Sequence, residues 1–226
     1  MTALIVVPLL AERVALGRRV PGALRVGGGP RRAAAAAGRI RSELDSGRYT
    51  GLLITGTCGG LMTGMRPGDL VVASEVDCAP GLAPSDMDRS ERDSRAQGAR
   101  PAQCVEPELL VEDLTEALRR HGHMVHIGRV YTADHLVDGP ERATIGATGA
   151  IAVDTESAIL AAAAGRWPVV VVRAVSDTQA RPLRSVGIVR NGLSALRSLR
   201  AAAPVVRNLS VPASTLALDE AEGEVS

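Results

Sequence analysis

Short apolar segments of two kinds alternate along the chain. Runs of about four to eight apolar residues are typical of buried strands, whereas apolar residues spaced three or four positions apart are typical of helices. We expect strands at residues 4–7, 23–26, 52–55, 69–76, 124–132, 150–153 and 168–175. We expect helices at residues 9–18, 31–44, 107–120, 140–148, 155–164 and 187–203. This alternation predicts an α/β layered domain with a parallel or mixed sheet.

Two segments interrupt the alternation. Residues 77–106 are rich in Pro, Ser, Asp and Arg and poor in large apolar side chains, which predicts a long surface loop or a lid. Residues 208–226 become polar and acidic, which predicts a disordered tail. We therefore expect one domain over residues 1–207.

Composition excludes several classes of protein. The 226 residues carry a net charge of +1, so no basic surface for nucleic acid is indicated. No apolar run reaches the ~18 residues of a membrane span, and the apolar start reads as a first strand. The 3 cysteines and 4 histidines show neither a disulfide pattern nor metal-ligand spacing, so no metal is expected and a reduced, cytoplasmic location is the default. With no Phe, 1 Trp and 2 Tyr, the core must be aliphatic.

Polar residues gather where the predicted strands end. The run Pro168–Val172 continues to Arg173, Ser176 and Asp177, and ligands of open α/β sheets bind at such strand ends. The glycine-rich stretch at residues 56–60 carries Thr57 and follows another buried strand, without the GK[ST] of a phosphate-binding loop.

Each of these features also has a structural explanation. Asp177 could cap a helix or form a turn, and the glycines could form a tight turn. Asp154 or Thr155 could serve as the N-cap of the next helix, with Glu156 favourable to its dipole. Glu12 could be a surface residue of the first helix.

Four stretches together resemble the nucleoside phosphorylase/nucleosidase superfamily. They are residues 54–61 (ITGTCGGL), 67–72 (PGDLVV), 149–157 (GAIAVDTES) and 172–177 (VRAVSD). Within that superfamily, residues 132–142, 147–157 and 184–197 are most similar to the hopanoid-associated phosphorylase/nucleosidase of actinobacteria. The resemblance implies a three-layer α/β/α fold with a central mixed, partly closed sheet.

The resemblance also implies a chemistry, the cleavage of the N-glycosidic bond of a nucleoside. Asp177 would donate a proton to N7 of a leaving purine, with Ser176 orienting its carboxyl group. Glu156 would accept hydrogen bonds from the ribose hydroxyls, and Glu12 would activate water. The residues expected to line the substrate site are Thr57, Gly59, Leu136, Val153, Asp154 and Thr155.

Two positions depart from the pattern of the family. Thr155 stands where a methionine usually packs under the ribose, and Leu136 stands near the position of an aromatic residue that stacks on the base. Leu136, His135 and Tyr131 are the nearest candidates for that contact.

The resemblance leaves the nucleophile and the activity to be decided. Ile54 falls near the position of a phosphate-binding arginine, which favours hydrolysis. The alternative is an anion site supplied by Arg19, Arg25, Arg31 or Arg32. The leading interpretation is a nucleosidase that releases adenine from a 5′-substituted adenosine, either adenosylhopane-like or methylthioadenosine/S-adenosylhomocysteine-like. The alternatives are a purine nucleoside phosphorylase with phosphate as co-substrate and a nucleoside-binding protein with little catalysis. No other cofactor is expected, and the resemblance implies a homodimer.

Overall fold

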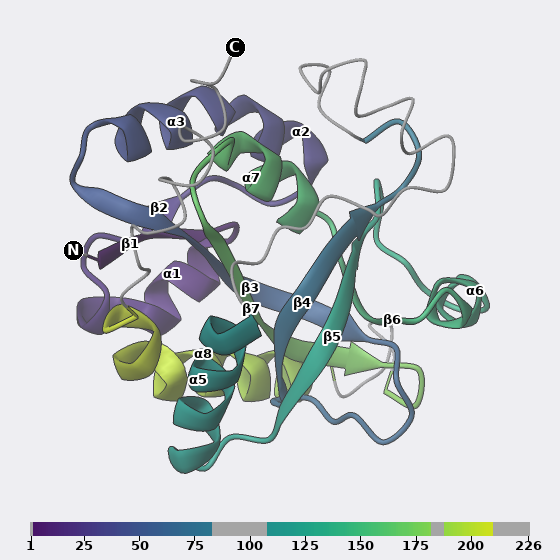
Figure 1. The fold of residues 1–226 in the computed structure, drawn as a ribbon. Helices are drawn as coiled ribbons and strands as arrows, with labels where there is room; N and C mark the ends of the chain where they lie inside the picture. Colours follow the sequence, from purple (N-terminus) through teal and green to yellow (C-terminus); the bar gives the residue numbers. More distant parts are fainter. Residues whose placement is uncertain (1, 83–107, 182–187, 210–226) are drawn as a thin grey trace.

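A single mixed sheet runs through the residues that the computed structural model describes, 2–82, 108–181 and 188–209 (Figure 1). Its seven strands in these ranges are β1 (Thr2–Val7), β2 (Leu24–Arg25), β3 (Tyr49–Gly60), β4 (Leu70–Cys78), β5 (Val125–Thr132), β6 (Ala150–Asp154) and β7 (Val169–Thr178).

The sheet closes on itself over most of its width. β3 pairs in parallel with β7 and antiparallel with β6, β6 pairs with β5, β5 with β4, and β4 antiparallel with β7. These five strands form a ring, and β1 and β2 extend from β3 as an open edge. The predicted mixed, partly closed sheet is therefore confirmed.

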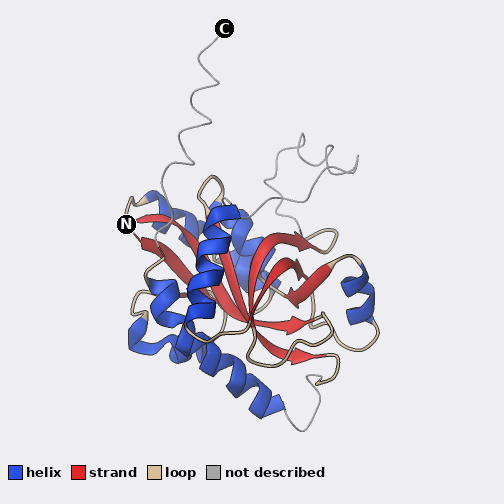
Figure 2. Cartoon of the chain, turned by 60° about the horizontal axis from the view of Figure 1, so that its bottom comes forward, coloured by secondary structure: helices blue, strands red, loops and turns tan. Residues whose placement is uncertain are grey.

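Helices cover both faces of the sheet. The helices are α1 (Leu10–Leu16), the 3-10 helix η1 (Gly17–Arg19), α2 (Pro30–Ala35), α3 (Ala37–Asp45), α5 (Glu108–Arg120), α6 (Glu141–Ala147), α7 (Ser157–Ala164) and α8 (Ile188–Arg207). Helices α2, α3 and α7 lie on one face, and α1, α5 and α8 lie on the other (Figure 1). Figure 2 shows helices on both sides of the sheet. Helix α6 lies apart from both layers, beside the end of β6 (Figure 1).

Alternate residues of each central strand enter two separate cores. In β7, Val170 and Val172 pack toward α1, α5 and α8, while Val169 and Val171 pack toward α3 and α7. Because side chains of a strand point alternately to the two faces, a run of four valines fills both cores at once. The prediction of a buried strand at this apolar run is confirmed, and the strand is buried on both faces.

The boundaries of several elements differ from the prediction. The helix predicted at residues 31–44 is divided at Ala36 into α2 and α3. Helix α8 continues through Pro204, and the burial of Val206 and Leu209 in the core beyond it offsets the backbone hydrogen bond that proline cannot make. Residues 77 and 78 belong to β4, and the rest of the predicted loop or lid lies largely outside the described residues, as does the tail from residue 210.

Candidate active site

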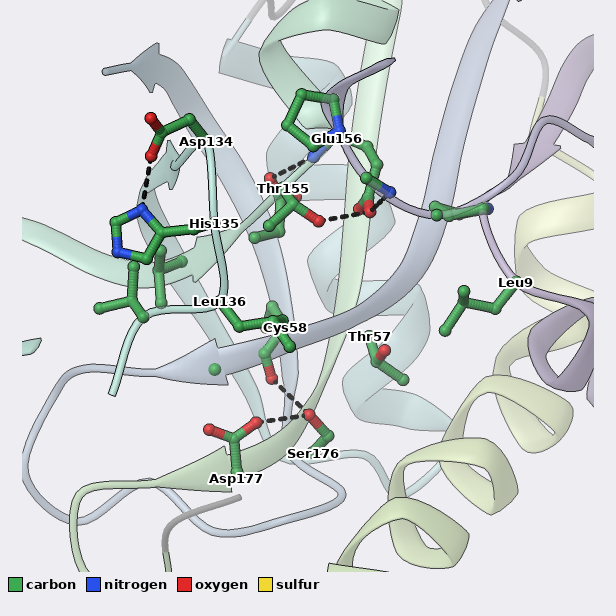
Figure 3. Close-up of a pocket in the computed structure, with 18 of the residues that line it drawn as sticks. Leu9, Thr57, Cys58, Asp134, His135, Leu136, Thr155, Glu156, Ser176 and Asp177 are labelled. Atoms are coloured by element: carbon green, nitrogen blue, oxygen red, sulfur yellow. Dashed lines mark hydrogen bonds and ion pairs between the residues drawn. The ribbon is translucent and has the colours of Figure 1, made fainter. Parts of the chain in front are cut away.

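A cavity of about 580 Å³ gathers the predicted site residues from five separate segments (Figure 3). This volume lies within the range of roughly 300–1,000 Å³ that is usual for small-molecule sites. The predicted residues that line it are Glu12, Thr57, Gly59, Leu136, Val153, Asp154, Thr155, Glu156, Ser176 and Asp177. Tyr131 does not line the cavity, because it packs in the small apolar cluster that also holds Ile145 of α6.

Glu12 is buried, although it lies in the first turn of α1. The residue is only 1% exposed, so the alternative of a surface glutamate is wrong. Oε2 accepts a hydrogen bond from the Leu9 backbone N–H (2.7 Å), and Oε1 accepts bonds from the Thr57 backbone N–H (2.8 Å) and the Thr57 hydroxyl (3.0 Å). A carboxylate is thus fixed at the cavity wall by three donors.

The glycine-rich stretch is the end of a strand and not a loop. Residues 56–60 continue β3 and pair with β7. A methyl group on Gly56 would lie 2.5 Å from Arg173 Nη1 and 2.9 Å from Glu12 Oε1. Glycine at this position therefore leaves room for polar side chains to cross over the strand.

An irregularity of pairing brings Ser176 and Asp177 to the same cavity. Cys58 pairs with Val175 and Gly59 pairs with Asp177, so Ser176 is an extra residue in β7. Such bulges redirect side chains next to active sites. Ser176 Oγ lies 2.7 Å from Asp177 Oδ1 and 3.1 Å from the Cys58 carbonyl oxygen, and its single proton can be donated to only one of them (Figure 3).

Arg142 of α6 is a partner of Asp177 that the sequence analysis did not identify. Its Nη1 donates to Asp177 Oδ2 at 2.5 Å, and both side chains are almost fully buried. Arg142 also lines the cavity. No motif or spacing signals this pair, because the two residues come from different elements and meet only through the fold.

Arg173 organises the charges beneath the cavity. This fully buried guanidinium donates to the Ser157 hydroxyl from Nε (3.0 Å) and Nη2 (2.8 Å), and Nη2 lies 2.8 Å from Asp154 Oδ2. Its Nη1 has no hydrogen-bond partner in the described part of the chain. The sequence could have indicated this buried ion pair, because a charged residue lies inside a run of apolar residues and a buried arginine needs a partner.

Asp154, the last residue of β6, accepts hydrogen bonds at the start of α7. Its Oδ1 accepts hydrogen bonds from the backbone N–H groups of Glu156 (3.2 Å) and Ser157 (3.1 Å) and from the Thr132 hydroxyl (2.9 Å). The N-cap residue of α7 is Glu156, so the expectation that Asp154 or Thr155 would be the N-cap is wrong, although Asp154 accepts hydrogen bonds from the first N–H groups of the helix. Asp154 lines the cavity, but its oxygens are directed mainly to the protein.

Glu156 lies next to Asp154 and Arg173, and its side chain is bound by a residue from the N-terminal part of the chain. Its Oε1 accepts a hydrogen bond from the Gly29 N–H (2.7 Å) and another from the Thr155 hydroxyl (Figure 3). Burial raises the pKa of Glu156, and the nearby Arg173 opposes that increase. Thr155, in the place of the expected methionine, therefore supports Glu156 through a hydrogen bond.

The segment before α6 provides the least buried part of the cavity wall. Leu136 is 75% exposed, and His135 bonds to Asp134 (2.5 Å) and Glu141 (2.9 Å). These two hydrogen bonds raise the pKa of His135.

No group of three or more metal-binding side chains occurs in residues 2–82, 108–181 and 188–209. Within the same ranges, no helix has the length and apolar character needed to cross a membrane.

Comparison with known proteins identifies the family. The family model of the phosphorylase superfamily matches residues 12–198, and the chain belongs to this superfamily. A search of the curated proteins finds no match.

Solved structures share the fold along nearly the whole chain. The 5′-methylthioadenosine/S-adenosylhomocysteine nucleosidase of Neisseria meningitidis, in complex with methylthio-immucillin-A, is 23% identical with a TM-score of 0.70, over 92% of this chain and 99% of that one. The nucleosidase of S. pneumoniae with a transition-state inhibitor is 22% identical (TM-score 0.65; 91% and 100% covered). A putative nucleosidase of Borrelia burgdorferi bound to adenine is 19% identical (TM-score 0.67; 91% and 99% covered).

Proposed function

We propose that the protein cleaves the N-glycosidic bond of a 5′-substituted adenosine by hydrolysis and releases adenine. The observation that carries this proposal is the meeting of Glu12, Glu156 and Asp177, from three distant segments, in one cavity. The nucleosidases with the same fold, and the ligands named with them, support the same substrate class.

Asp177 is assigned to the leaving base. As the bond between C1′ and N9 breaks, its electron pair passes to the purine, and N7 takes a proton from the Asp177 carboxyl group. A positioned general acid contributes about 10²–10⁴-fold to the rate. Ser176 and Arg142 hold the two oxygens of this carboxyl, which supports a fixed orientation toward the base.

Glu156 is assigned to the ribose. A carboxylate accepts hydrogen bonds from two neighbouring hydroxyl groups, and its negative charge stabilises the positive charge that develops on the sugar. The Gly29 N–H and the Thr155 hydroxyl both contact Oε1, which leaves Oε2 as the freer acceptor. Thr155 would then act on the sugar through Glu156.

Glu12 is assigned to the attacking water. The water oxygen bonds to C1′ while its proton passes to the carboxylate. Two observations favour water over phosphate. The Glu12 carboxylate already occupies the Thr57 N–H and hydroxyl that an anion would use, and its negative charge repels phosphate.

The 5′ substituent is assigned to the apolar part of the cavity wall. Leu9 and Leu136 line the cavity and are 45% and 75% exposed. An apolar group such as methylthio, or a longer hydrocarbon as in adenosylhopane, would cover them. Leu136 is also the candidate for contact with the base.

We further propose that the protein is a cytoplasmic homodimer. The exposed apolar residues Leu10 and Val14 on α1 support the homodimer, and light scattering of the purified chain tests this oligomeric state.

Adenine release with and without phosphate tests the function. The full chain is incubated with 5′-methylthioadenosine and with 5′-deoxyadenosine, and free adenine is quantified by chromatography. We expect equal release in both buffers. Release only with phosphate would replace hydrolysis by phosphorolysis, and no release in either buffer would favour a binding protein.

A matched pair of variants tests the assignment of Asp177. Asp177→Asn should lower kcat by about 10²–10⁴-fold, because the amide cannot supply the proton. Asp45→Asn, which lies outside the cavity and contacts Trp167, is the control and should leave kcat unchanged. Full activity of Asp177→Asn would remove Asp177 from the mechanism.

A further inference from the structure

One cation in the cavity wall has no partner in the described part of the chain. Three cationic side chains line the cavity there, those of Arg32, His135 and Arg142. Arg142 bonds to Asp177, and His135 bonds to two neighbouring carboxylates. Arg32 is exposed, and its guanidinium makes no hydrogen bond or ion pair with a described residue. Its charge is therefore accessible to a ligand in the cavity.

The stem of Arg32 is packed, although its guanidinium is free. A methyl group on Gly27 would lie 2.7 Å from Cδ of Arg32 and 3.0 Å from its Cβ, so the apolar part of the side chain crosses directly over this glycine. The Gly27 N–H in turn donates to the Pro8 carbonyl oxygen (2.9 Å). Arginine often packs its stem and leaves its charged end in solvent. A packed stem reduces the rotamer freedom that the side chain loses when a ligand binds.

The next glycine of the chain locates Arg32 relative to the proposed substrate. A methyl group on Gly28 would lie 2.7 Å from Leu9 Cδ2 and 3.9 Å from Glu156 Oε1. Gly28 thus lies between the leucine assigned to the 5′ substituent and the glutamate assigned to the ribose, and Arg32 lies over the residue before it. Because the base and the ribose hydroxyls have other assigned partners, the 5′ substituent is the part of the substrate left to reach Arg32.

The other charges of the cavity wall are mostly negative. The carboxylates that line it belong to Glu12, Asp134, Asp154, Glu156 and Asp177. They repel a negatively charged group of a ligand, whereas the guanidinium of Arg32 attracts it. The planar guanidinium can also donate two parallel hydrogen bonds to a carboxylate or a phosphate. An acid on the ligand is therefore favoured beside Arg32 and disfavoured elsewhere in the cavity.

We propose that Arg32 binds an anionic group at the free end of the 5′ substituent. The substrate class is then a 5′-substituted adenosine whose substituent carries an acid, such as a carboxylate, and Arg32 is its specificity-determining residue. Of the four arginines that could supply an anion site, Arg32 lines the cavity, whereas Arg19, Arg25 and Arg31 do not. The proposal rests on the proposed function for the orientation of the nucleoside.

A matched pair of compounds tests this specificity. 5′-(3-Carboxypropylthio)adenosine and its neutral amide, 5′-(3-carbamoylpropylthio)adenosine, have the same length and differ in charge. The kcat/KM of the wild type for the acid should be roughly 3- to 10-fold above that for the amide, because the ion pair is bidentate but exposed to solvent. Equal values would mean that Arg32 is only a solvated surface charge, and would overturn the proposal.

Variants of α2 assign the preference to one residue. Arg32→Met removes the charge and keeps an apolar stem over Gly27, so the ratio of kcat/KM for the acid over the amide should fall to about 1. Arg32→Lys should retain part of the preference, because its ammonium also attracts the acid. Arg31→Met, at an exposed position of the same helix that does not line the cavity, is the control and should keep the wild-type ratio. An unchanged ratio in Arg32→Met would refute the proposal.

Binding without cleavage separates this proposal from the proposed function. The Asp177→Asn chain is titrated with the acid and with the amide in a calorimeter, and the acid should bind more tightly by the same factor. Equal binding would overturn the assignment of Arg32, even if the wild type releases adenine. Tighter binding of the acid, without adenine release by the wild type, would count against the proposed function and support the anion site.

Inorganic phosphate is the other source of the same chemistry, because as a co-substrate it could occupy Arg32. The probe is adenine release from 5′-methylthioadenosine, which carries no acid, by wild type and Arg32→Met with and without phosphate. We expect phosphate to leave both proteins unaffected. A rate that increases with phosphate in wild type and not in Arg32→Met would assign Arg32 to phosphate and overturn the proposal.

Discussion

Replacement of Glu12 by glutamine tests the assignment of the nucleophile most directly. The two side chains have the same shape, so the variant removes the charge and one acceptor without opening a cavity. Oε1 accepts two hydrogen bonds from Thr57, and Oε2 accepts one from the Leu9 N–H. The amide oxygen should therefore remain toward Thr57, and the new NH₂ group should face the Leu9 N–H.

The structural effect of this change is modest. A buried donor that faces another donor costs about 1–3 kcal/mol. For a chain of this size, 1 kcal/mol corresponds to roughly 2–4 °C, so the Tm of Glu12→Gln should fall by about 2–12 °C. Most molecules thus remain folded at 25 °C.

The catalytic effect should be much larger. Without a base for the attacking water, kcat should fall by about 10²–10⁴-fold, equivalent to roughly 2.7–5.4 kcal/mol in the barrier. Adenine release from saturating 5′-methylthioadenosine measures kcat, and calorimetry on the same samples measures Tm. Glu43→Gln, at a surface ion pair with Arg48, is the control for a glutamate outside the cavity. A Glu12→Gln protein with more than half of the wild-type kcat would refute water activation by Glu12.

Three further results follow from the charges around the cavity. Arg173→Met leaves the Asp154 carboxylate without its buried partner at 2.8 Å, which should lower the free energy of unfolding by about 3–5 kcal/mol. Calorimetry should therefore show a Tm lower by roughly 6–20 °C, and a fall of less than about 3 °C would contradict this. Burial raises the pKa of Glu156 above 4.5, so the folded state binds this proton more tightly than the unfolded chain. The free energy of unfolding should therefore fall as pH rises from 4.5 through the raised pKa, and urea titrations of Glu156→Gln should lack this fall. Gly59→Ala places a methyl group against Arg142 and should lower kcat for adenine release, whereas Gly38→Ala, whose methyl meets nothing within 4 Å, should match wild type.

The layered fold could be predicted because its signals are local. Runs of valine and leucine fix the strands, and apolar spacing fixes the helices, as the two cores on either side of β7 confirm. Element ends were less predictable where tertiary contacts decide them. Pairing with β7 keeps residues 56–60 in a strand, although their glycines alone indicate a turn.

The site was predictable where its motifs are contiguous. Asp154, Glu156, Ser176 and Asp177 lie at or just beyond the ends of two strands in short recognisable stretches, and all line the cavity. The bulge at Ser176 and the pairing of Arg142 with Asp177 were not predictable, because both depend on how separate elements meet. The hopanoid substrate stays a prediction.

The parallel pairing of β3 with β7 has a consequence for biosynthesis. The buried residues Leu52, Leu53 and Ile54 pair with Val169, Val170 and Val171. When β3 leaves the ribosome, β1 is the one strand paired with it in the described fold that has already been synthesised. The 118 residues from Gly60 to Thr178 (178 − 60) then take roughly 6–24 s at about 5–20 residues per second. Until β7 is synthesised, one edge of β3 has no strand to pair with, and its apolar side chains stay exposed. Thr57 and Asp177 lie on these two strands, so the cavity forms only when most of the chain has been synthesised.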